Sequence, residues 1–354
     1  MASTRAAAII LVAMICGTMH YHPAAAMKVD TTGVAVADGL SLGFYQDTCP
    51  FVEHIVEFLV GEAFKKDVGI APALIRIFFH DCFPQGCDAS VLLNGTASEQ
   101  IQPPNQTLRP TALKLIEDIR AAVHSACGPV VSCADILALA TRDSLVDAGG
   151  PSYDVALGRR DALAPAVPDI TNTLPAPFFT VPQLIKSFGD RGLNVTDLVA
   201  LSGAHSFGVA HCPAFEDRFK NGTDTNPPID PKFAATLKAK CAGDNPVGTL
   251  TQKLDVRTPD KFDNKYYFDL VASQGLFKSD QALILHSATN RTAVRFSLNE
   301  GAFFTQFAIS MVKMSQMDVL TGTQGEIRNN CAVPNKRVGI ETAAGNNEGL
   351  TAEM

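Results

Sequence analysis

Residues 73–83 read Ala73-Leu-Ile-Arg-Ile-Phe-Phe-His-Asp-Cys-Phe83, an apolar run interrupted only by Arg76, His80 and Asp81. Arg76 and His80 are four residues apart, so a helix would place them on one face. A cation and an imidazole inside an apolar helix cost free energy unless their neighbours compensate. The pair is therefore either a structural pair satisfied by internal partners, or an acid/base histidine beside a charge stabiliser.

Working outward from this segment, the helical period dominates the chain. Alternating strand patterns are scarce, and Thr196 and Asp197 are the N-cap candidates for the helix ahead of Leu198. We therefore expect one all-α domain over residues 40–340, followed by a polar tail over residues 341–354. Apolar residues recur at helical spacing in five stretches, namely Phe51–Ala63, Leu113–Val123, Ile136–Leu145, Val199–Val209 and Phe303–Met314.

The N-terminus has the pattern of a secretory signal peptide over residues 1–26. Arg5 precedes an apolar stretch that is too short to span a bilayer comfortably, and the small residues Ala24, Ala25 and Ala26 follow. A membrane anchor and a disordered tail are the alternatives. Hydrophobic residues make up 46% of the chain and charged residues 18%, which suits a folded globular protein. The formal net charge of -7 gives no basic field for nucleic acid or an anionic membrane.

The cysteine count agrees with secretion. The chain has nine cysteines, and removal of Cys16 with the signal peptide leaves an even number, which in a secreted protein indicates disulfides. The count alone leaves the connectivity open. Five N-x-S/T sequons, each weak by itself, favour a glycoprotein: Asn94, Asn105, Asn194, Asn221 and Asn290.

From about Leu40 to Val338 the chain resembles the secretory plant peroxidases (class III haem peroxidases). The stretch Arg76-Ile-Phe-Phe-His-Asp-Cys-Phe-Pro-Gln-Gly-Cys-Asp-Ala-Ser90 resembles their distal motif, and Leu201-Ser-Gly-Ala-His-Ser-Phe-Gly208 resembles their proximal haem motif. The resemblance implies a mostly helical haem peroxidase fold with haem b between a distal and a proximal lobe. Further matches follow in order: Val131-Ser-Cys-Ala-Asp-Ile-Leu137, Gly149-Gly-Pro-Ser-Tyr153, Leu157-Gly-Arg-Arg-Asp161, Leu174-Pro-Ala-Pro-Phe178, Phe262-Asp-Asn-Lys-Tyr-Tyr267 and Ser279-Asp-Gln281.

The resemblance also implies the distal chemistry. Neutral His80 would take a proton from hydrogen peroxide and return it to the departing oxygen, while Arg76 stabilises the negative charge that develops. Phe79 would keep bulky reductants out of the pocket. A hydrogen-bond chain from the histidine through Asn105 to Glu99 would keep His80 unprotonated. An asparagine needed inside a pocket cannot carry a glycan, so we expect the sequon at Asn105 to be unmodified.

On the proximal side, the resemblance implies that His205 is the axial ligand of the haem iron and that Asp280 accepts its other N–H. Three alternatives remain. Ala204-His-Ser-Phe-Gly208 is close to a nucleophile elbow, which would make Ser206 a hydrolase nucleophile. A zinc site could use His80, Cys82 and Cys87. The fold could also be catalytically silent, although Arg76, His80 and His205 are all present.

The same resemblance implies two calcium sites, four disulfides and one buried ion pair. Closely spaced hard oxygens suit calcium. A buried ion pair between Asp135 and Arg159 is implied as a structural element. The distal calcium set would be Asp81, Pro84, Gly86, Asp88 and Ser90, and the proximal set Ser206, Asp255, Thr258, Lys261 (carbonyl) and Asp263. The implied disulfides are Cys49–Cys127, Cys82–Cys87, Cys133–Cys331 and Cys212–Cys241.

Small phenols are the reducing substrates that the resemblance implies, with hydrogen peroxide as the oxidant. Pro175 and the segment through Phe178 would form the rim at the exposed haem edge. We expect a monomer that binds neither nucleic acid nor membrane. The expected location is the apoplast, and the polar tail leaves vacuolar sorting as an alternative.

Overall fold

The computed structural model describes residues 32–220, 227–243 and 248–336, so the expected signal peptide and polar tail lie outside the described residues. Over these ranges the chain is mostly helical, as the sequence predicts, and its only sheet pairs the short strands β1 and β2 antiparallel. No helix in the described ranges is long and apolar enough to cross a membrane.

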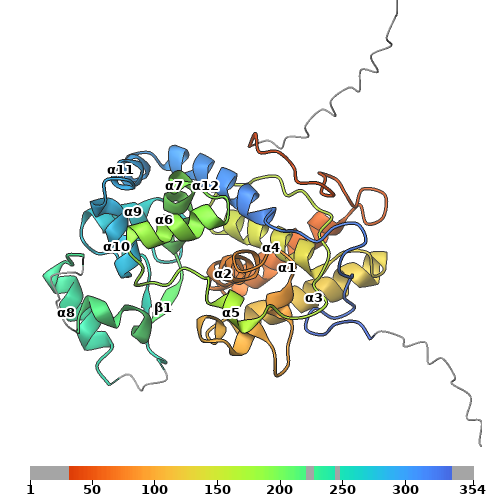
Figure 1. The fold of residues 1–354 in the computed structure, drawn as a ribbon, viewed down its shortest axis with the longest axis horizontal. Helices are drawn as coiled ribbons and strands as arrows, with labels where there is room; N and C mark the ends of the chain where they lie inside the picture. Colours follow the sequence, from red (N-terminus) through yellow and green to blue (C-terminus); the bar gives the residue numbers. More distant parts are fainter. Residues whose placement is uncertain (1–31, 221–226, 244–247, 337–354) are drawn as a thin grey trace, which may run out of the picture.

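The elements follow one another in the order of their labels in Figure 1. The α-helices are α1 Val52–Lys66, α2 Ile70–Cys82, α3 Pro110–Cys127, α4 Cys133–Asp147, α5 Pro168–Thr171, α6 Val181–Asp190, α7 Val195–Ser202, α8 Pro231–Lys240, α9 Lys265–Val271, α10 Lys278–Leu285, α11 Asn290–Leu298 and α12 Glu300–Ser315. The strands are β1 Val209–His211 and β2 Thr251–Lys253. The 3-10 helices are η1 Ser90–Leu92, η2 Glu99–Ile101, η3 Pro103–Asn105, η4 Gly203–Ser206 and η5 Cys212–Arg218.

Two groups of helices occupy opposite sides of the view in Figure 1. Helices α1 to α4 form one side, while α6, α7 and α9 to α11 form the other. Helix α12 packs against α7 and also contacts α2, so it joins the two groups. One apolar core runs through both groups, and a small second core lies beneath η5 and α8. This arrangement fits the two lobes that the sequence analysis expects.

A buried ion pair between Asp135 and Arg159 connects α4 to the C-terminal end of α12. Arg159 Nη1 lies 2.8 Å from Asp135 Oδ1, and both side chains are fully buried. Arg159 Nε and Nη2 donate to the Ser315 carbonyl at the end of α12, and Nη1 also donates to the Ala156 carbonyl. Tyr45 donates to the second oxygen of Asp135 at 2.8 Å. Both charges are therefore hydrogen-bonded as well as paired, which is the condition under which a buried ion pair is tolerated.

Two expected boundaries are wrong around α7. The N-cap is Asn194, whose side-chain oxygen accepts the backbone N–H groups of Thr196 and Asp197, so the two predicted cap residues lie inside the first turn. The stretch Val199–Val209 is not one helix either, because the α-helix ends at Ser202, tightens into η4 and then enters β1. His205 therefore projects from a 3-10 turn.

Candidate active site

The distal side chains project from α2. This segment is helical because its apolar side chains bury against α4, and His80 is itself almost fully buried. His80 Nδ1 lies 2.5 Å from the side-chain oxygen of Asn105. An amide oxygen can only accept, so Nδ1 carries the hydrogen and Nε2 is left as the basic nitrogen.

The electrostatics keep His80 neutral. Burial lowers its pKa to about 3, the positive charge of Arg76 acts in the same direction, and the bond to Asn105 opposes them. Burial also lowers the pKa of Arg76 to about 10, which still leaves this guanidinium charged at neutral pH. The pocket thus pairs a neutral imidazole with a cation, with Arg76 Nε 3.5 Å from His80 Nε2.

Asn105 connects His80 to Glu99 through the main chain. The Asn105 amide donates to the backbone carbonyl of Glu99 at 2.9 Å, while the Glu99 carboxylate accepts the N–H of Ala166 at 2.9 Å. The expected chain from histidine to asparagine to glutamate is therefore present, but it ends at the peptide oxygen. Burial raises the pKa of the Glu99 carboxyl group.

Thr107 is a residue of this pocket that the sequence analysis missed. Its hydroxyl and carbonyl each accept a hydrogen bond from the Arg76 guanidinium at 2.9 Å, and the carbonyl of Pro104 accepts a third at 2.9 Å. The available signal was the sequon Asn105-Gln-Thr107. Asn105 contacts His80 and Thr107 contacts Arg76, so the pattern has a reason other than glycosylation.

The proximal side brings His205 and Asp280 together across 75 residues of sequence. His205 Nδ1 lies 2.7 Å from Asp280 Oδ1, and the histidine side chain keeps 34% of its surface exposed whereas Asp280 keeps 3%. With Nδ1 engaged by a carboxylate, Nε2 is the nitrogen that can bind a metal. This is the arrangement that ligating histidines have in proteins, so the pair fits the iron of haem.

Two further aromatic residues, also missed by the sequence analysis, enclose this pair. The Tyr266 hydroxyl donates to Asp280 Oδ1 at 3.0 Å, and the Phe277 ring meets the His205 ring edge to face at 5.2 Å. The Phe277 N–H donates to the second oxygen of Asp280 at 3.0 Å. Tyr266 lies in the motif Phe262-Asp-Asn-Lys-Tyr-Tyr267, but the motif alone does not reveal its partner.

The expected distal calcium residues meet in one buried loop. Asp81 accepts the N–H groups of Ala89 and Val91, and Asp88 accepts the N–H of Ser90. The Ser90 hydroxyl is buried with no partner in the described residues. Burial, and then the neighbouring Asp88, raise the pKa of Asp81 well above its usual range. A buried hydroxyl without a partner beside two carboxylates offers the closely spaced hard oxygens that calcium prefers, so calcium fits this loop.

The expected proximal calcium residues form two linked groups. Ser206 donates to the Lys261 carbonyl at 3.0 Å and accepts the N–H of Asp263 at 2.9 Å. Asp255 accepts the N–H of Thr258 at 2.9 Å. One Asp255 oxygen and the Thr258 hydroxyl are buried without a partner among the described side chains. These unpaired hard oxygens fit a second calcium ion.

The disulfides match the expected pairs and exclude the zinc alternative. The bonds are Cys49–Cys127, Cys82–Cys87, Cys133–Cys331 and Cys212–Cys241. The sulfur atoms of Cys82 and Cys87 are bonded to each other, so they cannot bind a metal together with His80. Ser206 fails as a nucleophile as well, because it is fully buried at the end of η4 and is not on a strand-to-helix turn.

The rim expected around Pro175 lies next to the proximal site. Phe178 keeps 61% of its surface exposed, while Pro175 is partly buried. The Pro177 carbonyl accepts the N–H of Ser279 at 2.9 Å, which fixes the rim to the residue before Asp280. The exposed Phe178 ring therefore stands on a loop that is hydrogen-bonded to α10.

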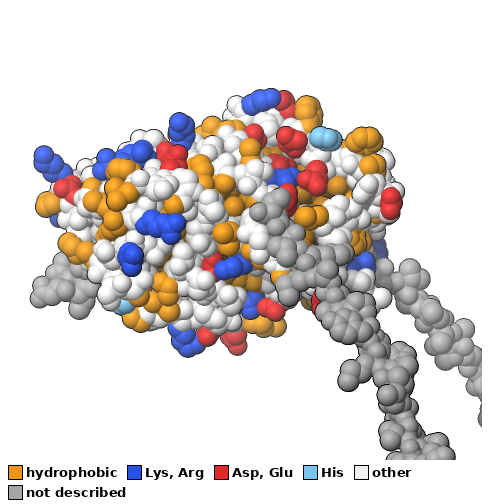
Figure 2. Space-filling view, turned by 90° about the horizontal axis from the view of Figure 1, so that it is seen from above, with side chains coloured by type: hydrophobic (Ala, Val, Ile, Leu, Met, Phe, Trp, Pro, Cys, Tyr) orange, Lys and Arg blue, Asp and Glu red, His pale blue; other side chains and the backbone are white. Residues whose placement is uncertain are grey.

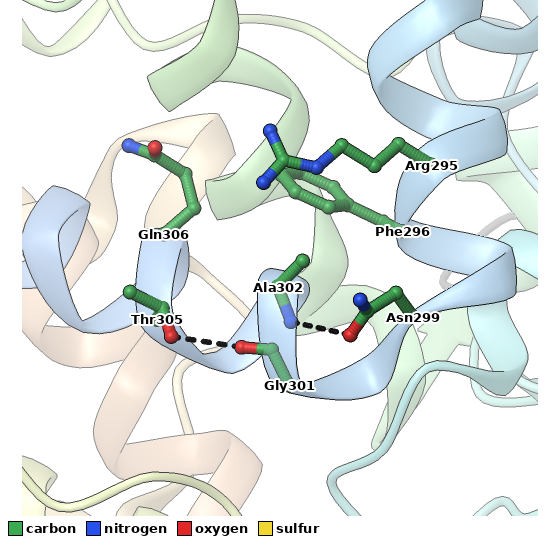
Figure 3. Close-up of a pocket in the computed structure, with 7 residues that line it drawn as sticks. All are labelled: Arg295, Phe296, Asn299, Gly301, Ala302, Thr305 and Gln306. Atoms are coloured by element: carbon green, nitrogen blue, oxygen red, sulfur yellow. Dashed lines mark hydrogen bonds between the residues drawn. The ribbon is translucent and has the colours of Figure 1, made fainter.

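A surface hollow elsewhere contains none of the expected site residues. It has a volume of about 430 Å³ and lies between α11 and α12 (Figure 3). Asn299 caps α12 there by accepting the N–H of Ala302, and the only charged side chain of the lining is Arg295. We assign no chemistry to it.

Comparison with known proteins agrees with this geometry. Residues 56–299 match the family model described as peroxidase. The chain is 50% identical to Peroxidase 12 of Arabidopsis thaliana over 92% of this chain and 91% of that protein. It is 51% identical to Cationic peroxidase SPC4 of Sorghum bicolor over 85% of this chain and 83% of that protein. It is 74% identical to Peroxidase 2 of Hordeum vulgare over 44% of this chain and 91% of that protein.

The chain therefore belongs to the plant peroxidase family, in its secretory class III branch. It is a haem peroxidase that uses hydrogen peroxide. Neither the serine hydrolase nor the catalytically silent alternative is favoured by these relatives, and the distal and proximal pairs are both assembled.

Proposed function

We propose that this chain binds one haem b through His205 and two calcium ions, reduces hydrogen peroxide with Arg76 and His80, and oxidises small phenols at the rim beside Pro175. The observation that carries the proposal is the pair of histidines, each locked by a different partner: His80 by Asn105 and His205 by Asp280. One histidine is held neutral and basic at Nε2, and the other is held as a ligand.

The side chains have separate tasks. Haem, when bound, supplies the iron centre at which peroxide is reduced and from which the two oxidising equivalents pass to donors. His80 Nε2 accepts the first peroxide proton and returns it to the departing oxygen as water forms. Arg76 stabilises the negative charge on that oxygen, held in place by Thr107 and Pro104. Phe79, half-buried beside His80, narrows the pocket.

Phenolic donors and an extracellular location are the finer parts of the proposal. The exposed Phe178, together with the partly buried Pro175, supports docking of a flat aromatic molecule at the rim, where each donor gives up one electron. The four disulfides support an oxidising compartment, either the apoplast or the vacuole. Basic and acidic side chains are interspersed on the face in Figure 2, which suits a monomer without nucleic-acid or membrane partners.

The test is the visible spectrum of the purified full chain before and after hydrogen peroxide is added. A Soret band that shifts and then returns when guaiacol is added supports haem binding, peroxide reduction and phenol oxidation together. A Soret band that does not change when peroxide is added contradicts the proposed roles of Arg76 and His80 in peroxide reduction. Folded protein that shows no Soret band and takes up no added haem overturns the proposal as a whole.

A further inference from the structure

Two hydrogen bonds converge on a single oxygen of the proximal carboxylate. Asp280 Oδ1 accepts from His205 Nδ1 at 2.7 Å and from the Tyr266 hydroxyl at 3.0 Å. Tyr266 and Asp280 each keep only 2% of their surface exposed, so water does not compete for this oxygen. The other oxygen of Asp280 takes the Phe277 N–H. Every donor around the carboxylate is thus supplied by a fixed protein group.

Sharing Oδ1 has a physical consequence for His205. A carboxylate that accepts the second N–H of a ligating histidine draws that proton toward itself and makes the imidazole a stronger donor to the metal. A second donor on the same oxygen takes up part of its negative charge. The bond to His205 Nδ1 then weakens, and the imidazole becomes a weaker donor. The strength of the axial ligand is one lever on the properties of haem iron.

We infer that Tyr266 is a positioning residue that limits the electron donation of His205 to the haem iron by sharing Asp280 Oδ1. The inference rests on the proposed role of His205 as the axial ligand. It adds to the pair of His205 and Asp280 a third residue, which acts through the carboxylate.

The neighbouring tyrosine gives a matched control. Tyr267 is on the same helix and is fully buried like Tyr266, but its hydroxyl donates to the backbone carbonyl of Val199 at 2.9 Å. Tyr266→Phe and Tyr267→Phe each delete one buried hydroxyl from α9. Only the first deletes a donor to Asp280. An effect of lost packing or lost stability alone appears in both variants, and an effect on the ligand appears in one.

The experiment uses the holoenzyme of wild type, Y266F and Y267F. The two readouts are the iron–histidine stretching band of the ferrous form by resonance Raman spectroscopy and the Fe(III)/Fe(II) reduction potential. We expect the Y266F band to shift to higher frequency and its potential to become more negative, while Y267F matches wild type. An unshifted Y266F, or an equal shift in Y267F, overturns the inference.

A second measurement covers the case in which Y266F does not fold. Wild type and Y267F are produced with 3-fluorotyrosine, whose more acidic hydroxyl is a stronger donor. Both proteins should then show the opposite shift, to lower stretching frequency, and the absence of that shift overturns the inference. If wild type itself lacks an iron–histidine band, the proposed function fails in its choice of axial ligand and the inference falls with it.

Discussion

His80 can act as a base at neutral pH because Asn105 determines which ring nitrogen carries the hydrogen and Arg76 helps to lower the pKa of the ring. Asn105 holds the hydrogen on Nδ1 at 2.5 Å, so the basic nitrogen is Nε2, the one beside Arg76. Burial and the Arg76 charge lower the pKa to about 3. An exposed histidine, with a pKa near 6.5, would be mostly protonated at mildly acidic pH. The buried His80 stays free to accept a proton at that pH.

The rate of peroxide reduction should therefore survive acidification. Protonated His80 cannot accept a proton, so the rate falls only as the pH drops toward the lowered pKa of about 3. Arg76→Leu removes the charge that helps to lower this pKa, so the inflection should move to higher pH. The rate itself should drop by about 10²–10³, which is typical for loss of one charge-stabilising donor. Stopped-flow measurement across the acidic range checks both effects.

Arg109→Leu is the control for this experiment, since Arg109 pairs with Asp67 and has no contact with His80. The control should keep the wild-type rate and inflection. An Arg76→Leu enzyme with an unchanged inflection would show that the Arg76 charge does not act on His80.

We expect Asn105 to be free of glycan. It keeps 1% of its surface exposed, and both ends of its amide are bonded, one to His80 and the other to the Glu99 carbonyl. Asn94 and Asn194 are exposed sequons in the same molecule and serve as internal controls. The Asn290 amide donates to the Ile284 carbonyl, and Asn221 lies outside the described residues, so neither is used as a control. Glycopeptide mapping after expression in a glycosylating host checks this prediction. An occupied Asn105 would remove it from the distal pocket.

Among the ion pairs between secondary-structure elements, the buried pair of Asp135 and Arg159 should contribute most to the free energy of unfolding. Asp135→Ala leaves a fully buried guanidinium without its counter-charge, and removal of one partner of a buried pair typically costs about 3–5 kcal/mol. The Asp135 carboxylate also accepts the N–H of Gly158 and the Tyr45 hydroxyl, which lose their partner as well. Urea unfolding of the variant measures the loss.

The comparison variant is Asp190→Ala, which breaks the exposed pair with Lys186 on α6. An exposed pair is screened by water and contributes little, so this variant should unfold close to wild type. Equal losses in the two variants would mean that burial does not decide the contribution of the Asp135 pair.

The helices differ in how well the amino-acid sequence predicts them. The apolar period predicted α3, α4 and α12, because burial of one helix face leaves a local pattern. It also predicted α1, but on the wrong face, since Phe51 and Phe58 are exposed and the buried side chains are Val52, Val56 and Val60. It misplaced the start of α7, since Asn194, Thr196 and Asp197 are all good cap residues and only the backbone conformation selects Asn194. It missed Thr107, which is 31 residues from Arg76, and Tyr266, because a hydrogen bond between distant segments leaves no periodicity.

Across the molecule as a whole, each of the two loops proposed to bind calcium begins directly after one of the two site histidines. Asp81 follows His80 on α2, and Ser206 follows His205 on η4. Each loop holds buried oxygen atoms that have no partner within the described residues, namely Ser90 Oγ on the distal side and Thr258 Oγ1 on the proximal side. A calcium ion would satisfy these oxygens and neutralise the paired carboxylates, so the proposed metal binding would be coupled to the position of each histidine.

Removal of calcium should therefore destabilise the molecule and slow peroxide reduction in the same sample. Without the ion, the like charges of Asp81 and Asp88 face each other in a buried loop, and proton uptake replaces cation binding. We expect chelated, metal-verified apoprotein to melt at lower temperature and to regain both stability and rate when calcium is returned. Calorimetry and stopped-flow measurement follow the two quantities.

Asp255→Asn separates the two sites, because it weakens only the proximal set and leaves the distal loop intact. This variant should lose stability and change the proximal spectroscopic signature while its rate with peroxide stays near wild type, since His80 is fixed by the other ion. A chelated enzyme with unchanged melting temperature and rate would show that the orphaned oxygens are satisfied without calcium. The coupling between metal and histidine would then have to be abandoned for both loops.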